Sequence, residues 1–217
     1  MLRTLDVLLV RHGESEGNAG QPTDDAASAV LTARGERQAE AVATLIERAP
    51  TLFVVSPYAR SRLTARPACA RFPEVPVEEW PVHEFTYLGP ASYRGSTVAE
   101  RRPAVEAYWT AGDPHGVQGE GAESFAVFLA RVHETRERLE RAAGDSIVVF
   151  SHKKFINALL WSWLAGRPAV SARRMARYRG FDHAVAFPNG ACVRVRLGEG
   201  GAWLGAICTV HLDGLPA

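Results

Sequence analysis

Residues 5–15 read LDVLLVRHGES. The run from Leu5 to Val10 is nearly all apolar and rich in residues that favour strands, which is typical of a strand buried on both faces of a mostly parallel sheet. Arg11 and His12 follow at once, so their side chains are expected at the carboxyl end of this strand. Gly13 lets the backbone come close to a ligand, because glycine carries no side chain. The stretch therefore predicts an α/β fold with polar chemistry at a strand end.

The order of strand, turn and helix recurs twice more. Short apolar runs at 52–55 and 147–150 predict two further buried strands. Helices are expected at 32–48, 56–64, 103–111, 124–143 and 155–164, with Pro67 ending or bending the second, and late strands at 185–187, 193–197 and 204–210. The pattern predicts a three-layer α/β/α arrangement, in which a mostly parallel sheet is flanked by helices.

One domain over residues 1–217 is the simplest organisation for a chain of 217 residues with 47% hydrophobic content, which is enough for a sizeable core. Residues 73–121 differ from the rest because they are rich in proline, glycine and aromatic residues. We interpret them as an elaborated segment that lies over the site.

The overall charge gives no reason to expect a nucleic-acid or membrane partner. Lys and Arg number 25 against 24 Asp and Glu, for a net charge of +1. The apolar run near residue 7 is too short for a signal peptide, and residues 155–165 are too short to span a bilayer. These observations favour a cytoplasmic protein.

The three cysteines are widely spaced and form no C-x-x-C pair. They are Cys69, Cys192 and Cys208, and we interpret them as reduced, buried thiols. The sequence contains no H-E-x-x-H motif and no local cluster of cysteine and histidine, so no metal site is predicted. His83, His115, His133, His183 and His211 are interpreted as surface or satisfied core residues.

Polar residues gather at the three predicted strand ends. In an open α/β sheet, ligands bind beyond the carboxyl ends of the strands, where the following helices direct free N–H groups at an anion. The first strand end carries Arg11, His12, Gly13 and Ser15 with Asn18 beyond, the second leads to Arg60, and the third ends at His152. Two guanidinium groups and two imidazoles are therefore expected at one rim.

This set of groups suits phosphoryl chemistry. Guanidinium groups match phosphate oxygens in pairs and neutralise the charge that develops when a phosphoryl group transfers. A neutral imidazole beside them is able to attack phosphorus. The charges of Arg11 and Arg60 should lower the pKa of His12 and keep this side chain an unprotonated nucleophile.

At this point the sequence resembles the histidine phosphatase superfamily, the group that includes cofactor-dependent phosphoglycerate mutase. Several ordered motifs carry the resemblance and span most of the chain. They are Arg11-His12-Gly13-Glu14-Ser15 with Asn18, Leu31-Thr32-Ala33-Arg34-Gly35 with Gln38-Ala39, Ser56-Pro57 with Arg60 and Thr64-Ala65, and Ser151-His152.

The resemblance implies a phosphoglycerate mutase-like fold and a phosphohistidine at His12, with no metal and no cofactor. In the family a carboxylic acid protonates the leaving oxygen, and Glu84 lies where that acid is expected. Arg11, Arg60 and His152 would bind the phosphoryl oxygens, and Asn18, Ser15 and the backbone at Gly13 would assist.

The sequence leaves two alternative roles open for each of two clusters of basic residues. The family often has glycines after its second histidine, where this chain has Lys153 and Lys154; these are either solvated lysines or a compensating anion site at a helix start. Arg94, Arg101 and Arg102 are either exposed or grip a second anionic group of a substrate.

The function expected from these residues is hydrolysis of a phosphomonoester on a small phosphorylated substrate. A phosphoglycerate mutase-type transferase is the first alternative, because it forms the same phosphohistidine. Retaining that intermediate needs a larger, more basic pocket than the sparsely basic 73–121 segment suggests, so water access and hydrolysis are favoured. A non-catalytic module that binds phosphorylated ligands is the second alternative. Fold does not choose among substrates, and the oligomeric state is open.

Overall fold

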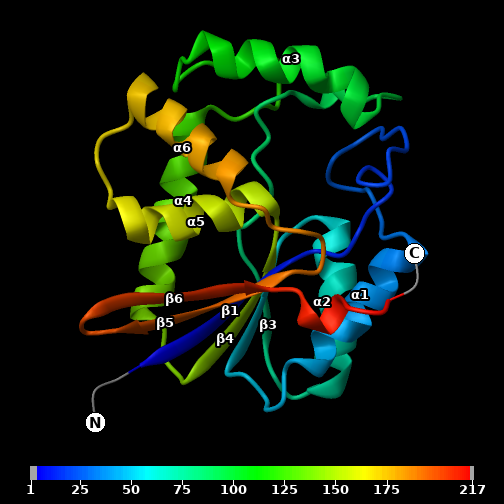
Figure 1. The fold of residues 1–217 in the computed structure, drawn as a ribbon, viewed down its shortest axis with the longest axis vertical. Coiled ribbons are helices and arrows are strands. Elements are labelled where there is room, and N and C mark those ends of the chain that lie inside the picture. The colour runs from blue at the N-terminus through cyan, green and yellow to red at the C-terminus, as the bar shows by residue number, and fades with distance from the viewer. Residues whose placement is uncertain (1–3, 216–217) are drawn as a thin grey trace.

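The structure, a computed structural model, describes residues 4–215 and is organised around one six-stranded sheet. The strands are β1 (Leu5–Arg11), β2 (Leu52–Val55), β3 (Val77–Glu79), β4 (Ser146–Ser151), β5 (Cys192–Gly198) and β6 (Gly201–Cys208). Their order is β3-β2-β4-β1-β5-β6 (Figure 1). β3, β2, β4 and β1 run parallel to one another, and β5 and β6 are antiparallel to their neighbours.

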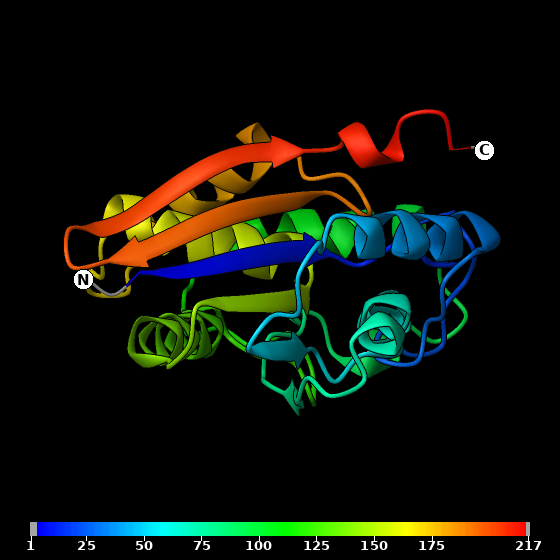
Figure 2. The same ribbon diagram turned by 90° about the horizontal axis from the view of Figure 1, so that it is seen from below.

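Helices cover both faces of the sheet (Figure 2). They are α1 (Ala33–Thr44), α2 (Ala59–Arg71), α3 (Val98–Ala111), α4 (Phe125–Arg141), α5 (Lys153–Ala165) and α6 (Ala172–Ala184), with the short 3₁₀ helices η1 (Pro90–Ser92) and η2 (Val210–Leu212). The predicted three-layer α/β/α fold with a mostly parallel sheet is confirmed.

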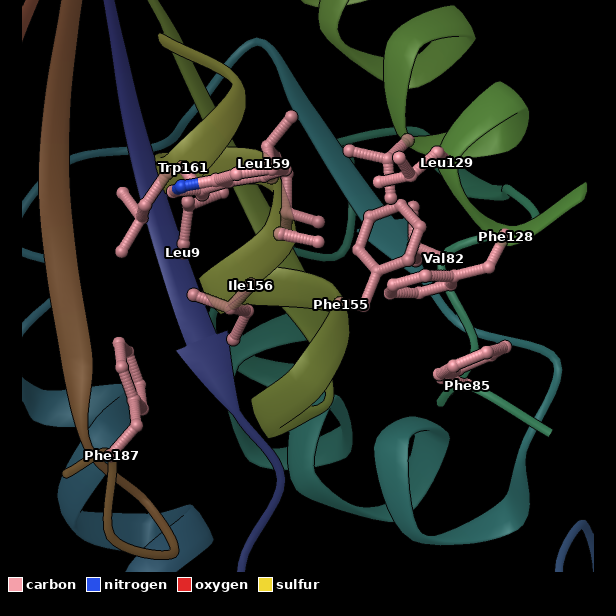
Figure 3. Close-up of a cluster of buried hydrophobic side chains, with 14 of the residues drawn as sticks. Leu9, Val82, Phe85, Phe128, Leu129, Phe155, Ile156, Leu159, Trp161 and Phe187 are labelled. Carbon is pink, nitrogen blue, oxygen red and sulfur yellow. The ribbon is translucent and has the colours of Figure 1, made fainter. Parts of the chain in front are cut away.

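The side chains of each strand pack alternately into two hydrophobic cores, one on each face of the sheet, because successive side chains of a strand point to opposite faces. Leu9 of β1 packs with residues of α4, α5 and α6, in the cluster drawn in Figure 3. Val10 packs on the other face, with Val42 of α1 and Ala68 of α2. The middle of each central strand is therefore a continuous apolar run, Val7 to Val10 in β1 and Ile147 to Phe150 in β4.

The register of β1 and β4 positions the candidate site. Val10 lies opposite Phe150, and Arg11 lies opposite Ser151. The two strands end at the same level, so the next residue of each chain segment, His12 and His152, emerges at the same edge of the sheet.

The second helix is longer than predicted. α2 begins at Ala59 and continues to Arg71, so the predicted end at residue 64 is wrong. Of the two expected effects of Pro67, ending the helix is excluded, because Pro67 lies inside it. The ring removes one backbone hydrogen bond. Thr64, Ala65 and Ala68 are buried on both sides of the proline, and this packing keeps the segment helical.

The expected strand at 185–187 is absent from the described residues. Val185 instead ends α6, a helix that was not predicted, and Phe187 is buried in the turn that leads to β5. The alternating pattern of this segment reflects burial of one aromatic ring, without strand pairing. The signals for α6 were the capping Ser171 and the inward spacing of Met175 and Tyr178.

α3 begins earlier than the expected 103–111 helix. Thr97 and Glu100 form a capping box, in which each side chain accepts from the other residue's backbone N–H, and Pro103 lies inside the helix. α3 runs across the top of the view in Figure 1. Within residues 4–215, no helix is both long enough and apolar enough to cross a membrane.

Candidate active site

His12 and His152 meet at the carboxyl edge of the sheet. Their ring centroids lie 4.9 Å apart, and both side chains are buried. The backbone N–H of His12 donates to the carbonyl oxygen of Ser151 at 3.0 Å, and this bond carries the pairing of β1 and β4 one residue further. Two imidazoles 140 residues apart in sequence are thus held by the sheet itself.

The hydrogen bonds of His12 fix its tautomer. Nδ1 lies 2.7 Å from the carbonyl oxygen of Gly13, which only accepts, so Nδ1 carries the proton. Nε2 accepts a 3.1 Å hydrogen bond from Nε of Arg60. The lone pair of His12 is therefore on Nε2, on the side of the ring that faces the arginine.

The surroundings keep His12 neutral. Burial is the main reason that its pKa lies well below the ordinary value of 6.5, and the charges of Arg60 and Arg11 lower it further. The hydrogen bond to Gly13 opposes this shift only in part. The sequence predicted that the two arginines lower the pKa of His12. Burial lowers this pKa more than the arginines do.

Arg60 is the hub of the site. Besides His12, its guanidinium donates to the carbonyl oxygen of Ala26 and, from Nη2, to Nδ1 of His152 at 3.0 Å. The ring of Tyr58 lies 4.9 Å from the guanidinium carbon. Thr64 Oγ1 donates to the Arg60 carbonyl and accepts from Gly13 N–H, so the first turns of α2 are tied to the loop after β1.

His152 acts on Arg60 in this structure and is not among the described residues that line the pocket. Its Nε2 lies 2.8 Å from Ser56 Oγ, and its Nδ1 accepts from Arg60, so the neutral ring donates to the serine. Burial and the charge of Arg60 hold the pKa of His152 well below 6.5. The hydrogen bond from Arg60 to the His152 ring therefore holds the guanidinium in place, from a position that is not part of the described pocket wall.

Two nitrogen atoms of the Arg11 guanidinium differ in their hydrogen bonding. Nη1 donates to the carbonyl oxygen of Phe187 at 2.6 Å. Nε is buried and has no hydrogen-bond partner within the described chain. A buried N–H without a partner costs free energy, so this donor is suited to an anion bound in the pocket that Arg11 lines.

Ser15 and Asn18 form a small network with Asn189. Asn18 Oδ1 accepts from Ser15 Oγ at 3.0 Å and from Asn189 Nδ2 at 2.9 Å. Asn189 also donates to the carbonyl oxygens of His12 and Gly13. Asn189 lies in the turn before β5 and was not predicted from the sequence. Ser15 and Asn18 both line the pocket.

The backbone of Gly13 was expected to come close to a ligand, and in the structure it lies close to the backbone of Gly35 in α1. A Cβ atom at Gly13 would lie 2.4 Å from the Gly35 carbonyl oxygen, and one at Gly35 would lie 2.0 Å from the Glu14 carbonyl oxygen. Gln38 Oε1 accepts from Glu14 N–H at 2.7 Å. The motif around Gly35 therefore holds the loop that carries His12.

Glu84 reaches the pocket from the 73–121 segment. Its Oε1 accepts from the backbone N–H groups of Phe85 at 3.0 Å and of Lys154, at the start of α5, at 3.1 Å. Phe85 stacks on Phe128 with ring centroids 4.3 Å apart, and Figure 3 shows both rings in the core. The residue next to the carboxylate is thus anchored in the core.

Arg131 of α4 supports the same segment and was not recognised in the sequence. It donates to the carbonyl oxygens of Pro81, His83 and Glu84 and forms a buried ion pair with Glu123 at 2.6 Å. Arg131 lies three residues after Phe128 and one before Val132, on the inward face of the helix. A charged residue on an apolar face was the signal that could have identified it.

Lys153 and Lys154 share one buried carboxylate. Lys154 Nζ lies 2.9 Å from Asp182 Oδ2, and Lys153 Nζ donates to the Asp182 carbonyl oxygen at 3.0 Å. Burial opposes the charge of Lys154, but Asp182 offsets this and the pKa of Lys154 is raised. The lysines are neither simply solvated nor free, and two cations face one anion beside the pocket.

A cavity of about 350 Å³ lies among the polar residues Arg11, His12, Ser15, Asn18, Arg60, Glu84, Lys153 and Lys154. The rest of its wall includes Tyr58, Phe85, Tyr87, Leu88, Tyr93, Val98 and Val105. Arg101 also lines it, and this guanidinium is bound to Ser96 and Thr23 and lies over the ring of Tyr93. Arg94 and Arg102 are exposed and are not among the lining residues.

Comparison with known proteins agrees with this geometry. The sequence profile of the histidine phosphatase superfamily (branch 1) matches residues 7–199. A probable phosphoglycerate mutase GpmB of Klebsiella pneumoniae (strain 342) is 31% identical over 181 residues, which are 79% of this chain and 80% of the relative.

Solved structures show the same fold. The alpha-ribazole phosphatase from Shigella flexneri superposes with a TM-score of 0.73 at 24% identity, covering 94% of this chain and 96% of its own. The phosphoserine phosphatase of Entamoeba histolytica, solved with 3-phosphoglyceric acid, gives a TM-score of 0.71 at 20% identity, over 96% and 99%. On the profile match and the 31% identical relative, the chain belongs to the histidine phosphatase superfamily.

Proposed function

We propose that this protein is a phosphatase that hydrolyses small phosphomonoesters through a phosphohistidine at His12. The observation that carries the proposal is the state of His12: a neutral ring with its lone pair on Nε2, beside the guanidinium of Arg60. A neutral imidazole is a nucleophile, and a guanidinium beside it stabilises the negative charge of a transferring phosphoryl group.

The first step forms the bond between His12 Nε2 and phosphorus and breaks the bond from phosphorus to the ester oxygen. Arg60 and Arg11 bind the phosphoryl oxygens, with the buried Nε–H of Arg11 as one donor. Asn18 and Ser15, which line the same cavity, complete the phosphate-binding site. The expected contribution of the Gly13 backbone is not retained, because its N–H is bound to Thr64 and Gly13 is not among the described lining residues. Glu84, which lines the same cavity, donates a proton to the leaving oxygen.

In the second step Glu84 takes a proton from water, the water oxygen attacks phosphorus, and the bond to Nε2 breaks. Inorganic phosphate and the original imidazole are regenerated. We assign His152 the role of positioning Arg60, since its Nδ1 accepts from that guanidinium. A direct hydrogen bond from His152 to the phosphoryl group would first require a proton on this nitrogen.

The pocket wall favours a substrate with an apolar or aromatic group beside its phosphate. Tyr58, Tyr87, Tyr93 and Leu88 form much of the wall, and burying apolar surface against them contributes to binding. A volume of about 350 Å³ suits a small organic phosphate. Aryl phosphates should therefore have a lower KM than glycerol phosphate, whose short hydroxylated chain offers little apolar surface to the wall.

A mutase that moves a phosphoryl group between substrate hydroxyls is the second candidate. The name of the Klebsiella pneumoniae relative supports it. So does the excess positive charge of Lys153 and Lys154 over Asp182, which could bind the carboxylate of a phosphoglycerate. Rapid interconversion of phosphoglycerates with slow phosphate release would favour the mutase.

The deciding experiment is phosphate release from p-nitrophenyl phosphate between pH 5 and 8 by the native protein and by His12→Ala. Release that depends on His12, with acid-labile phosphate on the native chain, is the expected result. Phosphate affinity with neither turnover nor labelled histidine, on aryl phosphates and phosphoglycerates alike, would contradict the proposal and indicate a binding module.

A further inference from the structure

The C-terminal part of the fold brings together two thiols and an imidazole that no local motif joins. Cys192 begins β5, Cys208 ends β6, and the two are direct partners in the antiparallel register. His211 lies in η2, which follows β6 and packs against α1 (Figure 1). One side-chain atom from each residue lies within 4.8 Å of the other two.

The imidazole is held as metal-binding histidines are held. Nε2 of His211 lies 2.9 Å from the carbonyl oxygen of Gly190, so in the neutral ring Nε2 carries the proton and Nδ1 carries the lone pair. Nδ1 is buried and has no hydrogen-bond partner within residues 4–215. Metal-bound histidines typically donate their second N–H to a carbonyl group in this way, which fixes the ring.

The hydrogen bonds within the described chain leave the polar atoms of these three side chains poorly satisfied. A buried nitrogen without a partner costs free energy, and the long contact from Cys192 Sγ to the Cys208 carbonyl oxygen, at 4.0 Å, is a weak hydrogen bond. Cys192 is buried, whereas Cys208 and His211 are half-buried, so the group is enclosed on one side and open to solvent on the other.

We propose that Cys192, Cys208 and His211 form a binding site for zinc. Two thiolates and a neutral imidazole suit a soft d¹⁰ cation, and the two thiolate charges balance Zn²⁺. Binding releases one proton from each thiol, and water from the open side supplies the fourth ligand. Tetrahedral zinc places its ligand atoms roughly 3.5–3.8 Å apart, so the three atoms need to close by only about 1 Å.

The site lies outside the catalytic pocket and is linked to it through one turn. Gly190, whose carbonyl binds His211, donates its own N–H to the carbonyl oxygen of His12 at 3.1 Å. Its φ of +75° is a conformation that glycine adopts readily. A metal at His211 would therefore stabilise the turn that supports the backbone of His12, without entering the reaction.

The test is a titration of the untagged, full-length protein, freed of metal and kept reduced with a phosphine, with Co²⁺ and then Zn²⁺. We expect one Co²⁺ per chain, with thiolate-to-cobalt absorption and the intense visible bands of a tetrahedral site, both abolished by stoichiometric Zn²⁺. At a zinc concentration about 100 times Kd, the Tm should rise by about 5–10 °C.

Three single variants identify the ligands. Cys192→Ser, Cys208→Ser and His211→Ala should each weaken Co²⁺ binding by at least about 100-fold, the upper end of the loss caused by removing a supporting contact of a metal ligand. Cys69→Ser is the matched control, because Cys69 is a free cysteine outside the group, and should bind as the native protein does.

Circular dichroism of each variant separates loss of the site from loss of the fold. Absence of thiolate-to-cobalt absorption in the folded, reduced native protein would overturn the proposal. Binding that survives in Cys192→Ser and Cys208→Ser would overturn it as well. Strong binding of Cu⁺ without binding of Zn²⁺ would overturn the assignment of the site to zinc.

Discussion

Arg60 donates through Nε to Nε2 of His12 and through Nη2 to Nδ1 of His152. One guanidinium thus contacts the proposed nucleophile and the second histidine together, from the first turn of α2. A phosphoryl group that reaches Nε2 must replace the first of these hydrogen bonds. Arg60 is therefore already placed where the charge of the incoming group will develop.

Replacing Arg60 should damage turnover more than folding. Arg60→Ala should lower kcat about 10²- to 10³-fold, the usual effect of removing one donor from a charge-stabilising site. Arg60→Lys should keep part of the activity, because it retains the charge and loses the paired geometry. Since Arg60 lowers the pKa of His12, the acid limb of kcat/KM should move to higher pH in Arg60→Ala.

The control for this measurement lies on the same helix. Arg62 is exposed and binds Glu79, so Arg62→Ala should leave both kcat and the pH profile unchanged. Equal losses in the two variants would mean that α2 had been disturbed as a whole, and the role given to Arg60 would fail.

Glu84→Gln should separate the two chemical steps. Without the acid, alkyl phosphates should react about 10²- to 10⁴-fold more slowly, whereas p-nitrophenolate leaves as an anion and needs no proton. The second step should be slow for every substrate, because Glu84 is the proposed base. Rapid mixing with p-nitrophenyl phosphate should therefore show a burst of nitrophenolate and accumulation of phosphohistidine.

Glu79→Gln, at an exposed carboxylate, is the matched control and should show steady-state kinetics like those of the native protein. A Glu84→Gln variant with native rates on alkyl phosphates would remove Glu84 from the mechanism and require another acid.

Arg131→Met should destabilise the fold and displace Glu84 together. It leaves Glu123 buried without its cation and removes donors from three carbonyl groups, so a loss of about 3–5 kcal/mol in the free energy of unfolding is expected. The double variant Glu123→Gln with Arg131→Met should recover part of this loss. Urea unfolding measures both.

The same variant tests the positioning role. kcat should fall while the inhibition constant of inorganic phosphate stays near the native value, because Arg131 supports Glu84 and does not line the phosphate cradle. Arg138→Met provides the comparison, since Arg138 is an exposed residue of α4 that pairs with Glu78. An equal loss of stability in both variants would contradict the assignment.

The strand ends were predictable from sequence because the rule that locates them is local. Short apolar runs identify buried parallel strands, and such strands end at one edge of the sheet, so Arg11, His12 and His152 could be expected together. α3 was predicted to begin at Pro103, because proline is common at a helix start, but the helix begins at Val98, after the capping box of Thr97 and Glu100.

Contacts between distant segments could not be read in the same way. The three carbonyl groups that Arg131 binds belong to a segment with no repeating pattern, and the pairing of Lys154 with Asp182 joins residues 28 positions apart. The Gly13–Gly35 contact depends on how α1 docks, which only the assembled fold defines. The sequence marks Arg131 only by its place on an apolar helix face, and nothing in the sequence identifies the carbonyl groups that it binds.

The two site histidines also make stability depend on pH. Burial holds the pKa of both His12 and His152 well below 6.5, and Arg60 lowers both further. Below about pH 6.5 the unfolded chain binds protons at these positions while the folded protein does not. The free energy of unfolding should therefore fall as the pH drops, by up to about 1.4 kcal/mol per pH unit for each histidine.

Urea unfolding at pH 7.5, 6.5 and 5.5 measures this slope. His12→Gln removes one of the two groups, because glutamine stays neutral throughout, so its slope below pH 6.5 should be smaller by about 1.4 kcal/mol per pH unit. Bound inorganic phosphate stabilises the folded state, and its anionic charge raises the pKa of the nearby imidazoles, so adding phosphate should flatten the native slope. A native slope that neither His12→Gln nor phosphate changes would mean that the pKa of His12 is not lowered in the folded protein. The site would then not hold this ring neutral below pH 6.5, contrary to the state on which the proposed function rests.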